Sequence, residues 1–307
     1  MNPVSLAAAL KEESLRLGFD LVGAAPAVAS PDFDRLQRWL AAGYAGKMRY
    51  FADRLDAYRH PASVLEGARS ILMLGMNYRS VEPAEAGPGQ AKVARYAWGA
   101  DYHEVIRVRL RQLADFHRRL VPPARVRGVV DTAPLFERRF GQLAGLGWIG
   151  KNTALINRRF GSWFVLAALL TTEELAYDEP TATDSCGTCR ACLDACPTGA
   201  LVEPGVLDAR KCISYLTIEM RGEMSKEDRK SCGNRLFGCD ACQEACPWNR
   251  CTPPTGETAF YPGPDMNPVE ISGLRALDDE SFRRRFCHTP LWRVKLGGIL
   301  RNINGSD

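Results

Sequence analysis

Residues 184–201 read DSCGTCRACLDACPTGAL, which places four cysteines within eleven residues. Two, two and three residues separate Cys186, Cys189, Cys192 and Cys196, and a proline follows. Ten of the eleven cysteines lie from Cys186 to Cys251, and none precedes Cys186. This clustering divides the chain near residue 180, where AYDEPTATD at 176–184 has the composition of a connector.

The N-terminal sequence and the apolar runs indicate the cellular compartment, which in turn decides how the clustered thiols are interpreted. The first residues, MNPVSLAAALKEESLRLGFD, do not resemble a signal peptide, because charged residues interrupt them early. The longest apolar run, WFVLAALL at 163–170, is too short to span a bilayer. We therefore expect a cytoplasmic protein with no membrane association. In that compartment clustered thiols bind metal or act in catalysis, and disulfides are disfavoured.

The spacing C-x2-C-x2-C-x3-C-P is typical of bacterial two-cluster ferredoxins. In that pattern three thiolates bind one [4Fe–4S] cluster, and the thiolate before the proline binds another cluster. The sequence GCDACQEACPWN at 238–249 supplies a second run with its own Cys-Pro pair, although it is one cysteine short. Cys212 and Cys232 are the candidates for the missing ligand.

Exchange of the thiolates before proline defines two sets of ligands. The first set is Cys186, Cys189, Cys192 and Cys246. The second set is Cys196, Cys239, Cys242 and one of Cys212 and Cys232. Tetrahedral zinc is the main alternative, because four thiolates also suit zinc. The two Cys-Pro pairs favour the clusters, and Cys251 and Cys287 are interpreted as ordinary thiols.

Upstream of the cysteines, apolar segments alternate with segments of helical spacing. Strands are expected at 19–26, 70–78, 126–132 and 162–171, and a helix at 102–120. The first residues predict another helix, with Ser5 as its N-cap and Gly18 at its end. Residues 80–92 are interpreted as a loop. With 307 residues, 46% of them hydrophobic, the chain can form an α/β or α+β domain with a covered sheet.

A glycine-rich stretch, GLGWIG at 145–150, resembles a nucleotide-binding motif but lacks its context. It follows a helix-like segment, FERRFGQLA, whereas a dinucleotide-binding motif follows a strand. Asn152 stands where a phosphate-binding loop has Ser or Thr. We therefore interpret the glycines as positions where backbone or a cofactor approaches closely.

DTAPLFER at 131–138 begins with Asp131 at the end of an apolar strand, where an aspartate is a helix cap or a functional residue. DTAPLFER, GWIGKNT, the first cysteine run, CISYLTIE and GNRLFGCDACQEACPWN occur in this order. Together they closely resemble the epoxyqueuosine reductase family. The resemblance extends from GYAGKMRYFADR at 43–54 to LGGILRN at 296–302.

The resemblance implies a cobalamin- and iron–sulfur-dependent oxidoreductase that reduces the epoxide of epoxyqueuosine to an alkene, at the wobble position of transfer RNA. It implies an α+β fold. An α/β corrinoid-binding domain similar to reductive dehalogenases occupies 1–178, a ferredoxin-like domain with two [4Fe–4S] clusters occupies 179–255, and the segment 256–307 packs back. It also implies that Asp131 is the proton donor, that Cys212 completes the second ligand set, and that Cys232 is spare.

Reduction of the epoxide requires electrons and a proton donor. Clusters deliver electrons singly, and cobalamin can gather them at one metal centre. A carboxyl is a poor acid at pH 7 unless burial raises its pKa, so we expect a desolvated Asp131 with a raised pKa. The resemblance implies base-off cobalamin without a protein histidine on cobalt. It also implies corrinoid contacts from Arg54, Asp131, Ser214 and Asp240. Without a corrinoid, Arg54, Ser214 and Asp240 would be a surface cation, a turn cap and a loop cap.

The RNA substrate is a polyanion, and the net charge of the chain is only +4. Basic residues are nevertheless locally dense, and they are candidates for phosphate contacts. They are Arg138, Arg139, Arg158, Arg159, Arg283 to Arg285, Arg293, Lys295 and Arg301, of which Arg138, Arg293 and Lys295 are the predicted transfer-RNA contacts. Many members of the family continue into HEAT-like repeats, which we do not expect here because the sequence ends at Asp307.

We expect a monomer that receives electrons from an external low-potential donor. Two other functions share parts of this pattern. A reductive dehalogenase has the same cofactors, but respiratory dehalogenases begin with a twin-arginine signal that is not seen here. A two-cluster electron carrier would not need the roughly 180 residues that precede the cysteines, about the length of a whole domain.

Overall fold

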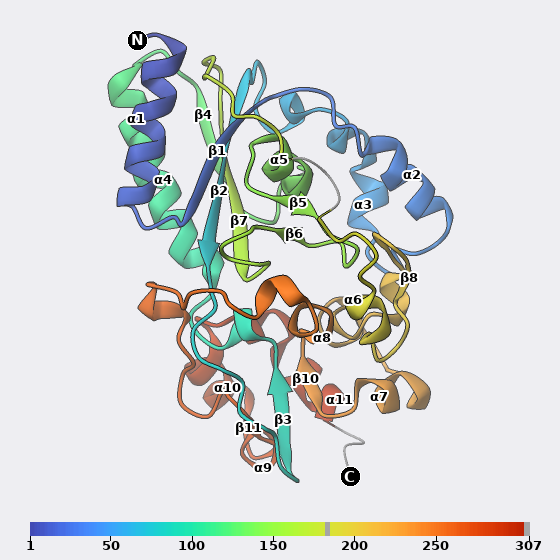
Figure 1. Cartoon of the computed structure of the whole chain (residues 1–307). Coiled ribbons are helices and arrows are strands. Elements are labelled where there is room, and N and C mark those ends of the chain that lie inside the picture. The colour runs from blue at the N-terminus through green and yellow to red at the C-terminus, as the bar shows by residue number, and fades with distance from the viewer. Residues whose placement is uncertain (182–184, 304–307) are drawn as a thin grey trace.

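The computed structural model describes residues 1–181 and 185–303. A four-stranded sheet fills its upper half, with its strands in the order β1-β2-β7-β4 (Figure 1). The strands are β1 (Leu21–Pro26), β2 (Ser70–Asn77), β7 (Phe164–Thr171) and β4 (Val126–Val129). They match the four predicted segments, and the central strand β2 is buried along its whole length.

Every neighbouring pair in this sheet is antiparallel, so the α/β interpretation of the first domain is wrong and the domain is α+β. Alternation of strands and helices along a sequence does not fix the direction in which each strand enters its sheet. Here β1 and β2 are separated by α2 (Phe33–Ala41) and α3 (Tyr50–Asp53), yet they pair side by side in opposite directions.

Helices cover both faces of the sheet. On one face α1 (Pro3–Arg16) and α4 (Tyr102–Leu120) form one apolar core with the strands, and α4 agrees with its predicted range. On the other face α5 (Glu137–Leu143) packs on β1, β2 and β7. The N-cap of α1 is Asn2, not Ser5, because Asn2 accepts the backbone N–H of Ser5 at 2.8 Å and a proline begins the helix.

The lower half combines segments from all three predicted parts of the chain. β3 (Gln90–Val93) pairs with β10 (Arg235–Phe237) and β11 (Val269–Glu270), so the segment interpreted as a loop ends in a strand. The three strands share one core with the C-terminal helices. These helices are α9 (Ile271–Arg275), α10 (Asp279–Phe286) and α11 (Lys295–Ile303). The sequence boundary near 178 therefore separates segments that pack together.

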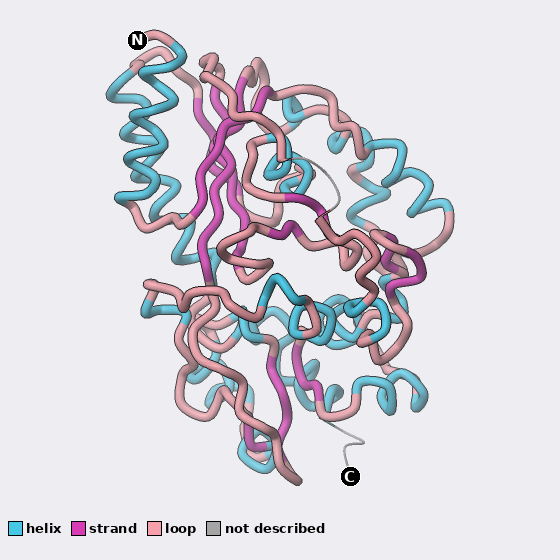
Figure 2. Tube along the Cα trace, in the orientation of Figure 1, coloured by secondary structure: helices cyan, strands magenta, loops and turns pink. Residues whose placement is uncertain are grey.

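Two four-residue helices carry central parts of the cysteine runs, α6 (Ala191–Asp194) and α8 (Ala241–Glu244). They contact each other where the two halves meet (Figure 1). Around them lie α7 (Lys226–Cys232) and a hairpin of β8 (Leu201–Glu203) and β9 (Val206–Leu207). Figure 2 shows how little strand structure surrounds the cysteine runs compared with the large sheet.

The glycine-rich stretch behaves as interpreted, because backbone approaches it closely. A small hairpin of β5 (Trp148–Ile149) and β6 (Leu155–Ile156) follows α5, and a side chain at Gly147 would overlap the carbonyl group of Ile156. Close packing thus accounts for glycine without a nucleotide. Of the helices within the described residues, none has the length and apolar character needed to cross a bilayer.

Candidate functional site

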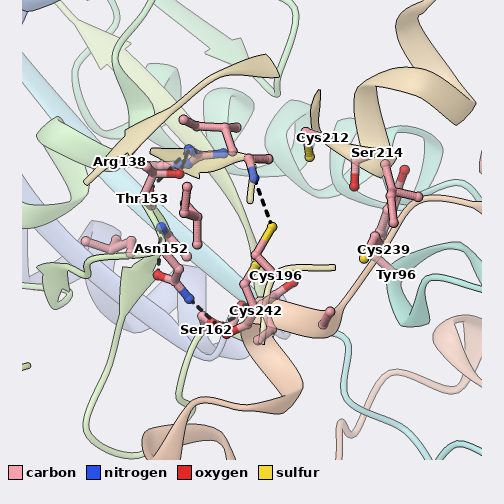
Figure 3. A pocket seen from close by; sticks show the side chains of 18 of the residues that line it. Tyr96, Arg138, Asn152, Thr153, Ser162, Cys196, Cys212, Ser214, Cys239 and Cys242 are labelled. Carbon is pink, nitrogen blue, oxygen red and sulfur yellow. Dashed lines mark hydrogen bonds between the residues drawn. The ribbon is translucent and has the colours of Figure 1, made fainter. Parts of the chain in front are cut away.

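The main cavity has a volume of about 410 Å³ and lies between the four-stranded sheet and the cysteine runs. Figure 3 shows Arg138 and Thr153 on one side, Ser214 and Cys239 on the other, and Cys196 and Cys242 between them. The residues with acidic or thiol groups that line it are Asp131, Glu137, Cys196, Cys212, Cys239 and Cys242. Carboxyl groups and thiols thus face one space.

A smaller cavity of about 50 Å³ is lined by the four cysteines of the first predicted set, Cys186, Cys189, Cys192 and Cys246. Trp248 also lines it and packs edge to face on Trp148, with ring centroids 4.9 Å apart. The Lys151 ammonium donates hydrogen bonds to the carbonyl oxygens of Gly187 and Cys189, the latter at 3.0 Å. These contacts hold the loop that carries the first two cysteines.

The two cavities divide the cysteines as the exchanged pattern predicts. Cys196 belongs to the first run but lines the main cavity, and Cys246 belongs to the second run but lines the small one. Within the described ranges, no three His, Cys, Asp or Glu side chains converge closely enough to hold a single metal ion. A [4Fe–4S] cluster does not need such convergence, because each thiolate binds a different iron at its own corner of the cube.

Cys212 and Cys232, the two candidates for the fourth ligand of the second set, lie in different surroundings. Cys212 lines the main cavity beside Cys196, Cys239 and Cys242. Cys232 ends α7, is only 3% exposed and lines neither cavity, although it belongs to the same apolar cluster as Cys212. Position therefore separates the two thiols, because only Cys212 faces the other three thiols of the second set.

Asp131 lies just beyond the end of β4, with its backbone in the left-handed region at φ 60°. Its Oδ2 atom accepts a hydrogen bond from the Tyr102 hydroxyl at 3.1 Å and lies 3.3 Å from Nε2 of His103. The Arg293 guanidinium donates to the same oxygen at 3.4 Å. Strained backbone of this kind is common at functional sites.

These neighbours overturn the expectation of a raised pKa. Burial pushes the pKa of Asp131 up, but the hydrogen bond with His103 and the charge of Arg293 outweigh it and bring the pKa to about 2. His103 in turn is held through Nδ1, 2.8 Å from the Asp101 carboxylate. Burial lowers the pKa of His103, yet the bonds to Asp101 and Asp131 raise it overall. Asp131 is thus ionised, and the neighbouring His103 ring binds a proton more readily than a free histidine does.

Glu137, which the sequence reading missed, is the second carboxyl in the main cavity. It begins α5, and its Oε1 atom accepts the backbone N–H of Asp131 at 2.9 Å. Burial, and next the charge of Asp131, raise the pKa of Glu137 to about 8. Its place in DTAPLFER, six residues after Asp131, was the available signal.

Besides Asp131, the three other predicted corrinoid residues lie in different places. Ser214 lines the main cavity and makes no capping hydrogen bond. Arg54 is exposed and donates to the carbonyl oxygen of Thr132 at 3.3 Å, next to Asp131. Asp240 lines a third cavity of about 260 Å³ and accepts the backbone N–H of Arg95 at 2.7 Å. Burial raises the pKa of Asp240 to about 6.

The basic residues proposed for RNA contact also divide into groups. Arg138 is exposed at the main cavity, where it donates to the carbonyl oxygen of Thr153 at 3.2 Å. Lys295 is exposed, with its ammonium group 3.3 Å from the centre of the Trp292 ring. Arg293 instead contacts Asp131. Arg139 pairs with Asp32, and Arg301 donates to backbone carbonyl groups, so these two serve the fold.

Comparisons with known proteins agree with this geometry. A family model described as "4Fe-4S double cluster binding domain" matches residues 185–249. A second model, described as "Epoxyqueuosine reductase QueG, DUF1730", matches residues 59–132, which end just past Asp131. Together the two matches include part of the lining of the main cavity, from Tyr78 to Asp131 and from Cys196 to Gln243.

Curated relatives match nearly the whole chain. An epoxyqueuosine reductase from Pseudomonas aeruginosa is 42% identical, over 98% of this chain and 85% of that protein. One from Cellulophaga algicola is 38% identical, over 96% of each. A crystal structure of an epoxyqueuosine reductase with an epoxyqueuosine-modified tRNA-Tyr stem loop aligns with a TM-score of 0.90 and 31% identity, over 99% of this chain and 82% of that one.

Proposed function

The chain belongs to the epoxyqueuosine reductase family, and from this premise we propose that it reduces the epoxide of epoxyqueuosine in transfer RNA to the alkene of queuosine. The reaction breaks both C–O bonds of the epoxide, forms a carbon–carbon double bond and releases the oxygen as water. It therefore consumes two electrons and two protons. One observation carries the proposal: carboxyl groups and a set of thiols face the same cavity.

The electrons pass through two [4Fe–4S] clusters, which the double-cluster family match supports. We assign the first cluster to the thiols of the small cavity and the second to those of the main cavity. Cys189 of the first set is exposed, so an external donor can approach that cluster from solvent. A cluster held by Cys196, Cys212, Cys239 and Cys242 would supply electrons beside the space where we place the substrate. Burial is one of the features that set the potential of each cluster.

We assign cobalamin to the main cavity, because this cavity brings the second thiol set and the two carboxyl groups to one space. When bound, cobalamin gathers the two electrons at one cobalt centre. Ser214, the second thiol set, Asp131 and Glu137 all line this cavity.

Asp131 supplies a proton to the oxygen that leaves. Its low pKa means that it does not store that proton alone in the resting site. His103 lies 3.3 Å from the Asp131 carboxylate, and Asp101 holds the opposite ring nitrogen at 2.8 Å. The proton is therefore shared between His103 and Asp131, and Tyr102 and Arg293 orient the carboxylate. A dehalogenase reading lacks comparable support, since relatives at about 40% identity are epoxyqueuosine reductases.

Transfer RNA binds over the mouth of the main cavity, with Arg138 and Lys295 contacting phosphates. Binding should weaken with salt, and replacing Lys295 by alanine should lower the log–log slope by about 0.7–0.9 for each phosphate contact removed. The change should leave iron content unaltered, because Lys295 contacts Trp292 and lines neither thiol cavity. Affinity for an anticodon stem loop, measured at several salt concentrations, checks this prediction.

Arg111, which is exposed on α4, offers a matched control, and its replacement by alanine should leave the slope unchanged. Equal slopes for wild type and the Lys295 variant would remove Lys295 from the RNA surface. Arg293 is unsuitable for this test, because its contact with Asp131 would mix RNA affinity with catalysis. Mass analysis of the nucleoside product tests the reaction itself.

A further inference from the structure

Two carboxyl groups face the main cavity, and the reaction consumes two protons. Their surroundings differ sharply. Asp131 is met at one oxygen by Tyr102, His103 and Arg293. Glu137 accepts one hydrogen bond, from the backbone N–H of Asp131, and forms no ion pair within the part of the chain that the structure describes. One carboxyl is thus arranged to be ionised and the other is not.

We propose that Glu137 is a second proton donor in epoxide reduction, delivering one of the two protons while Asp131 delivers the other. The inference rests on the proposed function, in which Asp131 is the first donor. Glu137 suits the role because it lines the cavity itself and begins a helix packed on the sheet, so its position is fixed. Its link to the Asp131 backbone, 2.9 Å long, keeps the two carboxyl groups neighbours.

The charges around Glu137 favour its neutral form. Burial acts first, and the Asp131 carboxylate adds to it, against the smaller opposing effects of Arg138 and His103. Tyr58 is the further titratable group that senses Glu137. The resulting pKa of about 8 leaves Glu137 protonated at neutral pH, while that of Asp131 is about 2. Paired carboxyls whose pKa values are driven apart usually take different roles in proton transfer. Here Glu137 holds its own proton, whereas Asp131 shares one with His103.

The protons and electrons balance in this scheme. Breaking the first C–O bond leaves an alkoxide, which takes one proton. Breaking the second bond releases the hydroxyl as water, with the other proton, as the double bond forms. One proton comes from Glu137, and the other passes from His103 through Asp131. The two electrons come from the clusters. His103 is then neutral and both carboxyl groups are ionised, and the repulsion between the two carboxylates favours reprotonation from solvent before the next turnover.

A positioning role is the alternative, in which Glu137 only anchors the Asp131 backbone. Glutamine distinguishes the two roles, because its side-chain oxygen can still accept the Asp131 N–H but its amide cannot supply an acidic proton. If Glu137 is a donor, Glu137→Gln should lower the single-turnover rate by about 10²–10⁴-fold. If Glu137 only anchors the loop, Glu137→Gln should keep nearly the full rate and Glu137→Ala should lose it.

The pH profile gives an independent reading. Wild-type activity should be present below about pH 8 and fall as the pH rises through the pKa of Glu137. Glu137→Gln should lose this fall, whereas Glu137→Asp, which keeps an acid, should retain activity and a shifted fall. A fall that persists unchanged in Glu137→Gln belongs to another group, such as His103, and contradicts the proposal.

The experiment uses the intact protein, reconstituted with both clusters and cobalamin, and an epoxyqueuosine-containing stem loop. Iron content and thermal melting of each variant show whether it has folded, and Glu137→Asp keeps the test decisive if Glu137→Gln has not. A low single-turnover rate for Glu137→Gln, together with retained activity in Glu137→Asp, supports the proposal. A nearly full rate for Glu137→Gln, with a low rate for Asp131→Asn, overturns the proposal and leaves the proposed function intact. Full rates for both variants would overturn the proposed function as well.

Discussion

Asp131→Asn should fold, carry both clusters and bind cobalamin, yet reduce epoxyqueuosine about 10²–10⁴-fold more slowly than wild type, the usual range for a positioned acid. Asparagine keeps the size of aspartate and tolerates the left-handed backbone that this position requires at φ 60°. It can still accept the Tyr102 hydroxyl but cannot supply an acidic proton. Single-turnover rates with reconstituted protein check the prediction.

Asp265 provides a matched control, because it also has a left-handed backbone, at φ 57°, and lies outside the main cavity. Asp265→Asn should turn over like wild type. If Asp131 only caps the following helix, asparagine is among the best replacements and the rate should stay high. Wild-type turnover by an Asp131→Asn protein with intact cofactors would remove Asp131 from the mechanism.

Cys212→Ser should lose about half of the iron and sulfide, since one of the two clusters lacks a thiolate, and should lose nearly all activity. The reason is positional: Cys212 lines the main cavity with the other thiols of the second set. Iron and sulfide analysis after anaerobic reconstitution, with an electron paramagnetic resonance spectrum of the reduced protein, checks the loss.

Cys232→Ser is the natural comparison, because Cys232 lies in the same apolar cluster but lines neither cavity. It should keep both clusters and near wild-type activity, apart from a modest loss of stability from placing a hydroxyl at a buried site. The reverse outcome, iron lost from Cys232→Ser and retained in Cys212→Ser, would show that the ligand assignment is wrong.

Local patterns predicted the parts of the fold that depend on local structure. The apolar runs marked β1, β2, β4 and β7, and helical spacing marked α4, because burial on one face imposes its period on the sequence. Strand direction was not predictable from these patterns, and the sheet is antiparallel where an α/β domain was expected. Nor was the pairing of β3 with β10, which joins residues more than a hundred positions apart.

The site shows the same division. The spacing of the cysteines predicted which thiols share a cavity, because short helices hold neighbouring ligands in fixed positions. The ionisation of Asp131 could not be predicted, since it depends on His103 and Arg293, which are 28 and 162 residues away in the sequence. For the same reason the sequence predicted only a transfer-RNA contact for Arg293 and did not single out Glu137.

The central claim is that this chain removes the epoxide oxygen of epoxyqueuosine in RNA. The most direct test is anaerobic incubation of the reconstituted protein with an epoxyqueuosine-containing stem loop, cobalamin and a low-potential reductant, followed by mass analysis of the nucleosides. We predict that epoxyqueuosine disappears and that a nucleoside lighter by one oxygen atom, queuosine, replaces it only when cobalamin and reductant are both present. Unchanged epoxyqueuosine, in protein shown to hold both clusters and cobalamin, would contradict the account.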